Sequence, residues 1–274
     1  MASDDENPVS ETYTHGHHES VLRSHSWRTV ENSAAYLLPH LVPGLSLLDV
    51  GAGPGTITAD FAARLAPGRV VGIDSSAEIV AQAAALAESQ DLDNVVFETA
   101  DVYALPYPDD SFDVVHAHQV LQHLADPVAA LVEMRRVAKP GGLLAVRDVD
   151  YRGTIWAPEN AGLDHWMTVY QLVHRGNGGE PDAGRHLKGW AREAGLTDIA
   201  SSASIWCFAS DAERVWWGES WATRALESKF YADAIEKQAA TDLDLHAISD
   251  AWLAWRDAPD GWFAMPHGEL LARV

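Results

Sequence analysis

The sequence has 274 residues, and 40 Asp and Glu against 19 Lys and Arg give it a formal net charge of −21. Phosphate-rich surfaces require basic patches, so this charge argues against a nucleic-acid partner, and no run approaches the ~18 apolar residues of a membrane-spanning helix. The acidic N-terminus does not resemble a secretory signal and the single cysteine cannot form an intrachain disulfide, so we expect a cytoplasmic protein without membrane insertion.

The first half of the chain alternates strand-like and helix-like patterns. Residues 1–40 are expected to form a disordered acidic tail followed by a helical lid, with helical spacing over 17–41. The segment 41–150 is expected to be one core, with strands at 45–50, 69–74, 94–100, 112–119 and 143–150 and helices at 56–66, 76–90 and 127–138. Strands rich in Val, Ile and Leu with little alternation are typical of a parallel sheet covered on both faces. The pattern therefore predicts a doubly wound α/β fold.

The second half, residues 151–274, is less regular and is expected to supply substrate-side helices and two late strands, 198–209 and 262–274. Trp206 and Trp262 lie in these strands and are expected in the core. An insertion at 211–258 has helical patterns and five tryptophans, at positions 216, 217, 221, 252 and 255. Core packing is favoured for them, although one helix face cannot bury both Trp216 and Trp217. One of that pair is a candidate for contact with a ligand or with a second subunit in a homodimer.

A glycine-rich turn joins the first strand of the core to its first helix. Gly51, Gly53 and Gly55 permit positive φ angles and a close approach of a ligand to the backbone, and the helix that follows offers unpaired N–H groups. Asp74 ends the next strand, where an acidic side chain can accept the hydroxyls of a ribose. The turn therefore predicts a nucleoside site, the alternative being a turn that only packs strand against helix.

Two kinds of cofactor compete for this turn. A dinucleotide site carries G-x-G-x-x-G, whereas this chain has G-x-G-x-G, with Thr56 in the place of the third glycine. Asp49 precedes the turn and would repel a pyrophosphate but would suit an ammonium group. The pattern favours a cationic nucleoside ligand and keeps a nicotinamide-dependent oxidoreductase as the alternative.

The segment 49–56, D-V-G-A-G-P-G-T, resembles motif I of the class I S-adenosylmethionine-dependent methyltransferases. Further motifs follow in that family's order at 70–76, 100–106, 110–115 and 139–142, and their spacing most resembles the ubiquinone and menaquinone C-methyltransferase subgroup. The resemblance covers about residues 40–150. It implies a Rossmann-like sheet, S-adenosyl-L-methionine as methyl donor and S-adenosyl-L-homocysteine as product.

The resemblance also implies roles for individual residues around the cofactor. Gly51, Ala52 and Gly53 would line the methionine portion, with Asp49 near its amino group and His118 beside it. The nucleoside would be held by Asp74 at the ribose hydroxyls, Ser75 and Ile79 beside the adenine, Asp101 at the adenine amine and the Val102 N–H at the ring.

Three residues near the N-terminus resemble a group that folds over the cofactor in glycine-type N-methyltransferases: Tyr13, Trp27 and Arg28. Arg28 would bind the methionine carboxylate with two parallel hydrogen bonds. For Tyr13 and Trp27 the alternative is ordinary helix packing. The nearby histidines at 15, 17, 18 and 25 are either a lid segment or a solvated tract.

Methyl transfer from a sulfonium is an in-line displacement that needs alignment and exclusion of water but no metal. A base helps only when the acceptor arrives protonated, and His118 and His123 are the candidates, with a lining or structural role as the alternative. His116 and His118 could suggest a metal site, but no nearby cysteine completes a ligand set, so none is predicted. The tryptophans suggest a small apolar or aromatic acceptor, with O, N or C methylation left open. A catalytically inactive, methyltransferase-like binding protein is a further alternative.

Overall fold

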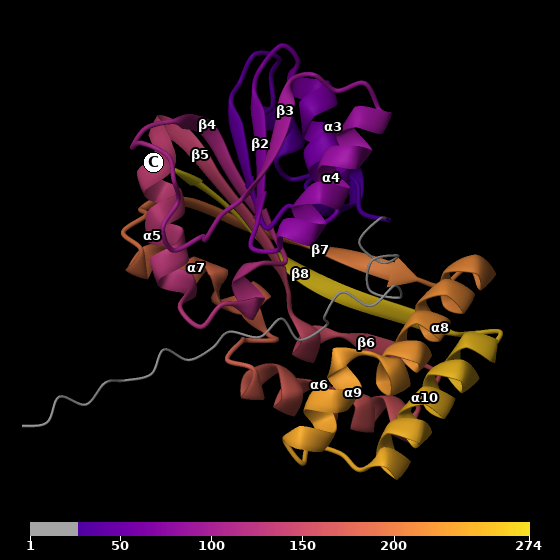
Figure 1. Ribbon diagram of the computed structural model, residues 1–274. Helices are drawn as coiled ribbons and strands as arrows, with labels where there is room; N and C mark the ends of the chain where they lie inside the picture. Colours follow the sequence, from indigo (N-terminus) through magenta and orange to yellow (C-terminus); the bar gives the residue numbers. More distant parts are fainter. Residues whose placement is uncertain (1–26) are drawn as a thin grey trace, which may run out of the picture.

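The computed structural model describes residues 27–274 and shows these as one α/β unit built on an eight-stranded sheet (Figure 1). The strand order is β3-β2-β1-β4-β5-β8-β6, and β7 pairs with the other edge of β8. The strands are β1 Leu47–Val50, β2 Val70–Asp74, β3 Val95–Thr99, β4 Phe112–His118, β5 Ala138–Val149, β6 Ile155–Ala157, β7 Asp198–Phe208 and β8 Trp262–Arg273. Strands β1 to β5 pair in parallel, as the apolar runs predicted.

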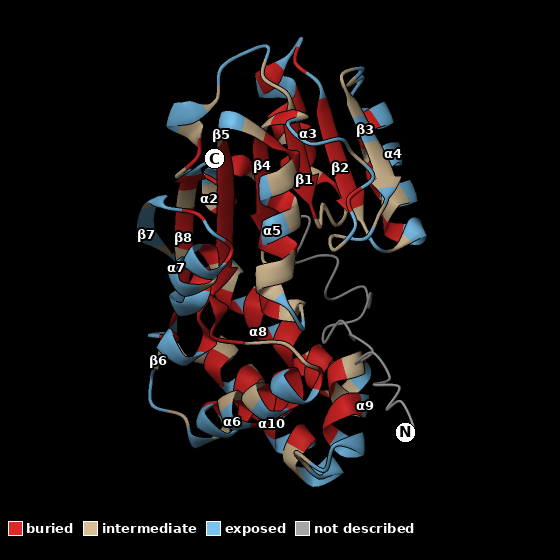
Figure 2. Ribbon diagram, turned by 90° about the vertical axis from the view of Figure 1, so that its left-hand side faces the viewer, coloured by how far each residue is buried: buried red, intermediate tan, exposed pale blue. Residues whose placement is uncertain are grey.

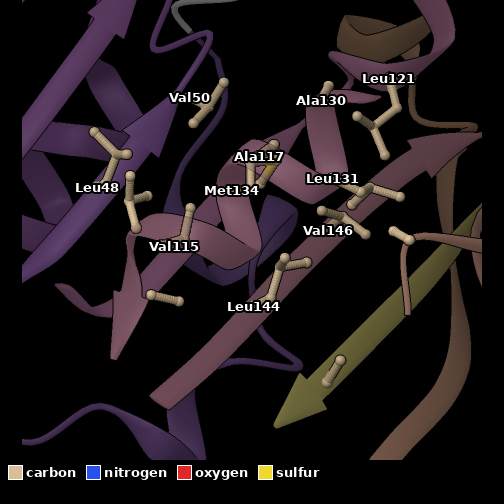
Figure 3. Packing of buried hydrophobic residues seen from close by; sticks show 14 of the residues in the cluster. Leu48, Val50, Val115, Ala117, Leu121, Ala130, Leu131, Met134, Leu144 and Val146 are labelled. Carbon is tan, nitrogen blue, oxygen red and sulfur yellow. The ribbon is translucent and has the colours of Figure 1, made fainter. Parts of the chain in front are cut away.

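Helices cover both faces of the parallel half. The helices α3 Thr56–Leu65 and α4 Ala77–Ser89 lie on one face, and α5 Pro127–Val137 and α7 Ala183–Glu193 lie on the other (Figure 1). Alternate strand residues point to opposite faces: Leu47 and Val114 pack in the cluster with α3, whereas Leu48 and Val115 pack against α5 and α7 (Figure 3). The central strands are therefore buried on both faces (Figure 2), and the prediction of a doubly wound sheet is confirmed.

Strand β8 is antiparallel to its neighbours and joins the two halves of the molecule. It pairs with β5 through residues 267–273, with β6 through 262–264 and with β7 through 263–273. Both late strands lie where the sequence predicted them. Strand β5 begins at Ala138, earlier than predicted, because Ala138 already pairs with Phe112 before the register shifts.

A second group of helices lies beyond the parallel half: α6 Ala161–Gly176, α8 Asp211–Glu227, α9 Lys229–Glu236 and α10 Asp242–Asp257 (Figure 1). Their shared core is aromatic, and Trp221, Trp252 and Trp255 are fully buried in it. Trp217 is buried and the adjacent Trp216 only partly so. The prediction for Trp262 was wrong: it is 37% exposed, because the alternation of β8 turns the neighbouring Phe263 inward.

The N-terminal part of the described chain holds little helix. Thr29 caps the short α2 Val30–Ser33, and the 3-10 helix η1 Leu38–His40 follows. Two further 3-10 turns, η2 Leu121–His123 and η3 Tyr151–Gly153, follow β4 and β5. The expected acidic tail and most of the expected lid, with Tyr13 and the four N-terminal histidines, lie outside the described residues. Among residues 27–274, no helix has the length and apolarity needed to cross a bilayer.

Candidate functional site

A cavity of about 820 Å³ lies at the carboxyl ends of β1, β2 and β4. Such an edge of a doubly wound sheet is where ligands bind in this class of fold. The cavity brings together most of the residues singled out from the sequence: Arg28, Asp49, Gly51, Ala52, Gly53, Asp74, Ser75, Ile79, Asp101, Val102, His118 and His123.

The glycine turn forms one wall, and its backbone is left-handed at Gly51 (φ +67°), Gly53 (+55°) and Gly55 (+86°). A Cβ on Gly51 would overlap the side chain of Val120, whereas a Cβ on Gly53 would meet no atom within 4 Å. Gly51 is thus required by packing, while Gly53 leaves space at the cavity wall. The following helix α3 begins at Thr56 and has no side-chain cap.

Three aspartates around the cavity are tied into the framework. The carboxylate of Asp74 accepts hydrogen bonds from the N–H groups of Gly53 (3.1 Å) and Ser76 (3.0 Å), so it links the end of β2 to the glycine turn. Asp101 accepts one from the N–H of Tyr103 (2.9 Å). Each of these carboxylates retains lone pairs for a ligand, since a carboxylate offers about four.

Asp49 is the most buried of the three, at 3% exposed. Its two oxygens accept hydrogen bonds from the Thr58 hydroxyl (2.6 Å) and from Nδ1 of His116 (2.7 Å). Asp49 therefore joins β1 to α3 and β4. The role expected for it, binding the amino group of a ligand, would have to use its remaining lone pairs.

The histidines lie in different surroundings. His118 is 5% exposed, and burial, followed by the nearby cations Arg147 and Arg28, holds its pKa well below the ordinary value. His123 is half-buried, and its ring stacks on that of His174 at 5.0 Å between centroids. Among the described residues, no group of three or more His, Cys, Asp or Glu is arranged to hold a metal ion.

The ring that stacks on His123 belongs to His174, and two hydrogen bonds fix its tautomer. His174 donates from Nε2 to the carbonyl of Gln122 (2.8 Å) and accepts at Nδ1 from the Tyr170 hydroxyl (3.1 Å). Burial lowers the pKa of His174 to about 4, so this ring is neutral at physiological pH. A neutral neighbour leaves His123 free of charge repulsion from that side.

Arg28 and Trp27 are neighbours in the sequence, but only Arg28 lines the cavity. Arg28 lines the cavity, and its Nη2 donates to Oε1 of Gln119 at 2.7 Å. Trp27 does not line it: its ring packs on Trp206 at 5.1 Å and on Trp216 at 5.5 Å. For Trp27 the structure thus corresponds to the packing alternative, because aromatic partners from β7 and α8 surround it. Tyr13 lies outside the described residues.

Gln119 is a polar lining residue that sequence reasoning did not assign to the site. It follows β4 directly and has a left-handed backbone (φ +54°), which is uncommon for a residue with a side chain. Its position at the carboxyl end of a central strand was a usable signal. Its partners were not, because Arg28 and His267 lie 91 and 148 residues away in the sequence.

The strand order, the glycine turn and the aspartate that ends β2 define a doubly wound fold of the class whose ligands bind at the carboxyl ends of the strands. A family model described as a methyltransferase domain matches residues 41–195. A methyltransferase of Schizosaccharomyces pombe, named as uncharacterized, is 35% identical over 268 residues, which cover 94% of this chain and 95% of that protein. The chain therefore belongs to the methyltransferase family.

Two more comparisons concern the parallel half of the sequence and the fold. A ubiquinone/menaquinone biosynthesis C-methyltransferase of Bdellovibrio bacteriovorus is 40% identical over 103 residues, 38% of this chain and 43% of that protein. The crystal structure of the YcgJ protein of Bacillus subtilis superposes with a TM-score of 0.59 at 19% identity, covering 89% of this chain and 98% of that one. The second comparison concerns the fold alone.

Proposed function

We propose that this protein is an S-adenosylmethionine-dependent methyltransferase that acts on a small-molecule acceptor. The observation that carries the proposal is the cavity at the strand ends, where Asp74, Asp101 and the open face of Gly53 meet Arg28. Membership of the methyltransferase family supports the same reaction.

The lining suits a ligand with a nucleoside at one end and an amino acid at the other. Asp74 is available to ribose hydroxyls and Asp101 to an adenine amine, and Gly53 allows a close approach to the backbone. Arg28 is the one Lys or Arg among the described lining residues, and it offers a partner for a carboxylate. A pyrophosphate would face Asp49 and Asp74 with a single arginine to offset its charge, which disfavours a dinucleotide.

The bound cofactor would supply a methyl group on a cationic sulfur. The chain would contribute a walled cavity that aligns the acceptor and excludes water. Tyr103, Val120 and Leu124 add apolar surface to the lining, and the similarity to a quinone C-methyltransferase supports an apolar or aromatic ring acceptor.

For an acceptor that must lose a proton, His123 is a better candidate for the general base than His118. Neighbouring cations and burial weaken His118 as a base, whereas His123 is half-buried beside a neutral ring. For an acceptor with an O–H group, His123→Asn is expected to lower kcat by about 10²-fold or more and to leave S-adenosylhomocysteine affinity unchanged. The change in kcat is measured by mass spectrometry, as transfer of a deuterated methyl group to a panel of phenols and quinols. An equal or larger kcat loss in His118→Asn would assign the base to His118 instead.

The cofactor is tested by calorimetric titration with S-adenosylhomocysteine. Asp74→Ala is expected to weaken binding more than about tenfold, or 1.4 kcal/mol, because the ribose loses its acceptor. Asp198→Ala serves as the matched control, since Asp198 is exposed at the start of β7 and lies outside the cavity. Absence of wild-type binding, with heat from NADH instead, would replace the proposal with an oxidoreductase. Cofactor binding without transfer to any acceptor would favour a binding protein.

A further inference from the structure

A line of hydrogen bonds connects the cavity wall to β8. Nη2 of Arg28 donates to Oε1 of Gln119 at 2.7 Å, and Nε2 of Gln119 lies 2.8 Å from Nε2 of His267. Nδ1 of His267 lies 3.0 Å from the carbonyl oxygen of Met265. The line thus joins the N-terminal segment, the end of β4 and the last strand.

The donors and acceptors along this line have only one consistent arrangement. A guanidinium can only donate, so the amide oxygen of Gln119 faces Arg28 and its NH₂ faces His267. Nε2 of His267 must then accept, and its Nδ1–H donates to Met265. His267 is therefore neutral, in agreement with its burial, which holds its pKa well below the ordinary value.

The same place holds two arginines beside one aromatic ring. The guanidinium carbons of Arg28 and Arg147 lie 5.6 and 4.8 Å from the ring centroid of Trp206. Arg147 is 1% exposed, and the nearest carboxylate oxygen, on Glu269, is 3.5 Å from its Nε. Two guanidinium groups beside one ring repel each other, and an anion at Arg28 would offset that repulsion.

We propose that Gln119, held by His267, is a positioning residue that orients Arg28 toward the carboxylate of the ligand. An arginine side chain loses rotamer entropy when it is fixed. The hydrogen bond to Gln119 fixes it before the ligand arrives. Gln119 has a left-handed backbone, and its amide contacts both partners, one through its oxygen and one through its nitrogen. This inference rests on the proposed function, because it takes the anionic end of the ligand to be the amino-acid end of the cofactor.

The test compares two ligands that differ only at that end. S-Adenosylhomocysteine carries the carboxylate, whereas 5′-methylthioadenosine is the same nucleoside thioether without the amino-acid portion. Gln119→Ala is expected to weaken S-adenosylhomocysteine about tenfold by calorimetry and to change 5′-methylthioadenosine less than twofold. His267→Phe keeps an aromatic ring against Trp206 but removes the acceptor, so it should reproduce the selective effect of Gln119→Ala: weaker S-adenosylhomocysteine binding and little change for 5′-methylthioadenosine.

A double-mutant cycle separates positioning from a direct contact. Arg28→Ala is expected to weaken S-adenosylhomocysteine at least as much as Gln119→Ala, and the double variant no more than Arg28→Ala alone. Gln90→Ala, at the exposed end of α4 and outside the cavity, is the control and should bind both ligands like the wild type.

The outcomes distinguish the two proposals. Equal weakening of both ligands by Gln119→Ala, or additive losses in the cycle, would overturn the positioning role while leaving cofactor binding intact. A wild type that binds neither ligand would overturn the proposed function itself. If Gln119→Ala does not fold by circular dichroism, His267→Phe decides by the same comparison: selective weakening of S-adenosylhomocysteine supports the positioning role, and equal weakening of both ligands overturns it.

Discussion

Asp148 carries a buried carboxyl at the end of β5, just beyond Arg147. It is fully buried, its Oδ1 accepts a hydrogen bond from the N–H of Gln122 (3.3 Å), and Oδ2 has no partner. Burial raises its pKa from 3.8 to about 7, with the backbone hydrogen bonds and Arg147 acting in the opposite direction. The folded protein therefore holds this proton more tightly than the unfolded chain does.

The pH dependence of stability follows from that difference. A raised pKa contributes stability that is fully present below about pH 4 and is lost as the pH rises through 7. Asp148→Asn removes the ionisation, so its free energy of unfolding relative to the wild type should rise by a few kcal/mol between pH 4 and pH 8. Urea unfolding of both proteins at several pH values measures this.

The comparison isolates Asp148 because the other buried groups are present in both proteins. His118, His174 and His267 have lowered pKa values and so contribute stability that is lost as the pH falls below about 6.5. Their contribution cancels in the difference between variant and wild type. Unfolding curves whose difference does not change with pH would show that Asp148 is ionised in the same range in both states.

At the scale of elements, the parallel strands were predictable and the orientation of the late strands was not. Strands β1, β2 and β4 and the second half of β5 are buried on both faces, so most of their residues are apolar and a short window of sequence reveals them. Strand β8 alternates between a more exposed and a buried residue at its start, and a shift of one residue would exchange the two sides. Trp262 is large and apolar, but it lies on the outer side of that alternation.

A buried tryptophan of the second helical group and an exposed one on β8 should contribute very different amounts to the free energy of unfolding. Trp166 on α6 is fully buried, with ring centroids of Trp221 and Trp252 at 4.7 and 4.9 Å. Trp166→Ala should cost about 3–5 kcal/mol of unfolding free energy, because it leaves a cavity among rigid rings. Trp262→Ala, at the 37% exposed position on β8, should change it by about 0.5 kcal/mol or less.

Denaturation in urea compares these two variants with the wild type. Similar losses in both would mean that the exposed face of β8 contributes as much stability as the buried ring cluster. The helical pattern of the insertion favoured core packing but did not reveal the role of Trp166, because its partners lie on α8 and α10, far away along the chain.

At the scale of the whole molecule, the site depends on contacts that no local pattern encodes. The glycine turn and Asp74 are close in sequence and belong to a motif, so their meeting at one strand edge could be predicted. Arg28, Gln119 and His267 come from three distant segments and meet only because β4, β5 and β8 are neighbours in the sheet. Of these three residues only Arg28 was singled out from the sequence, and none of the hydrogen bonds between them could be predicted from it.

The place of β8 in the sheet also affects how the chain is made. Every other element that the structure describes is synthesised before it, yet β8 lies between β5 and β7 and also pairs with β6. Until it emerges from the ribosome, β5 has an open edge and β7 lacks the strand it pairs with, and open edges favour association between chains. A nascent chain therefore cannot close its sheet, or bring His267 to Gln119, before translation has passed residue 273.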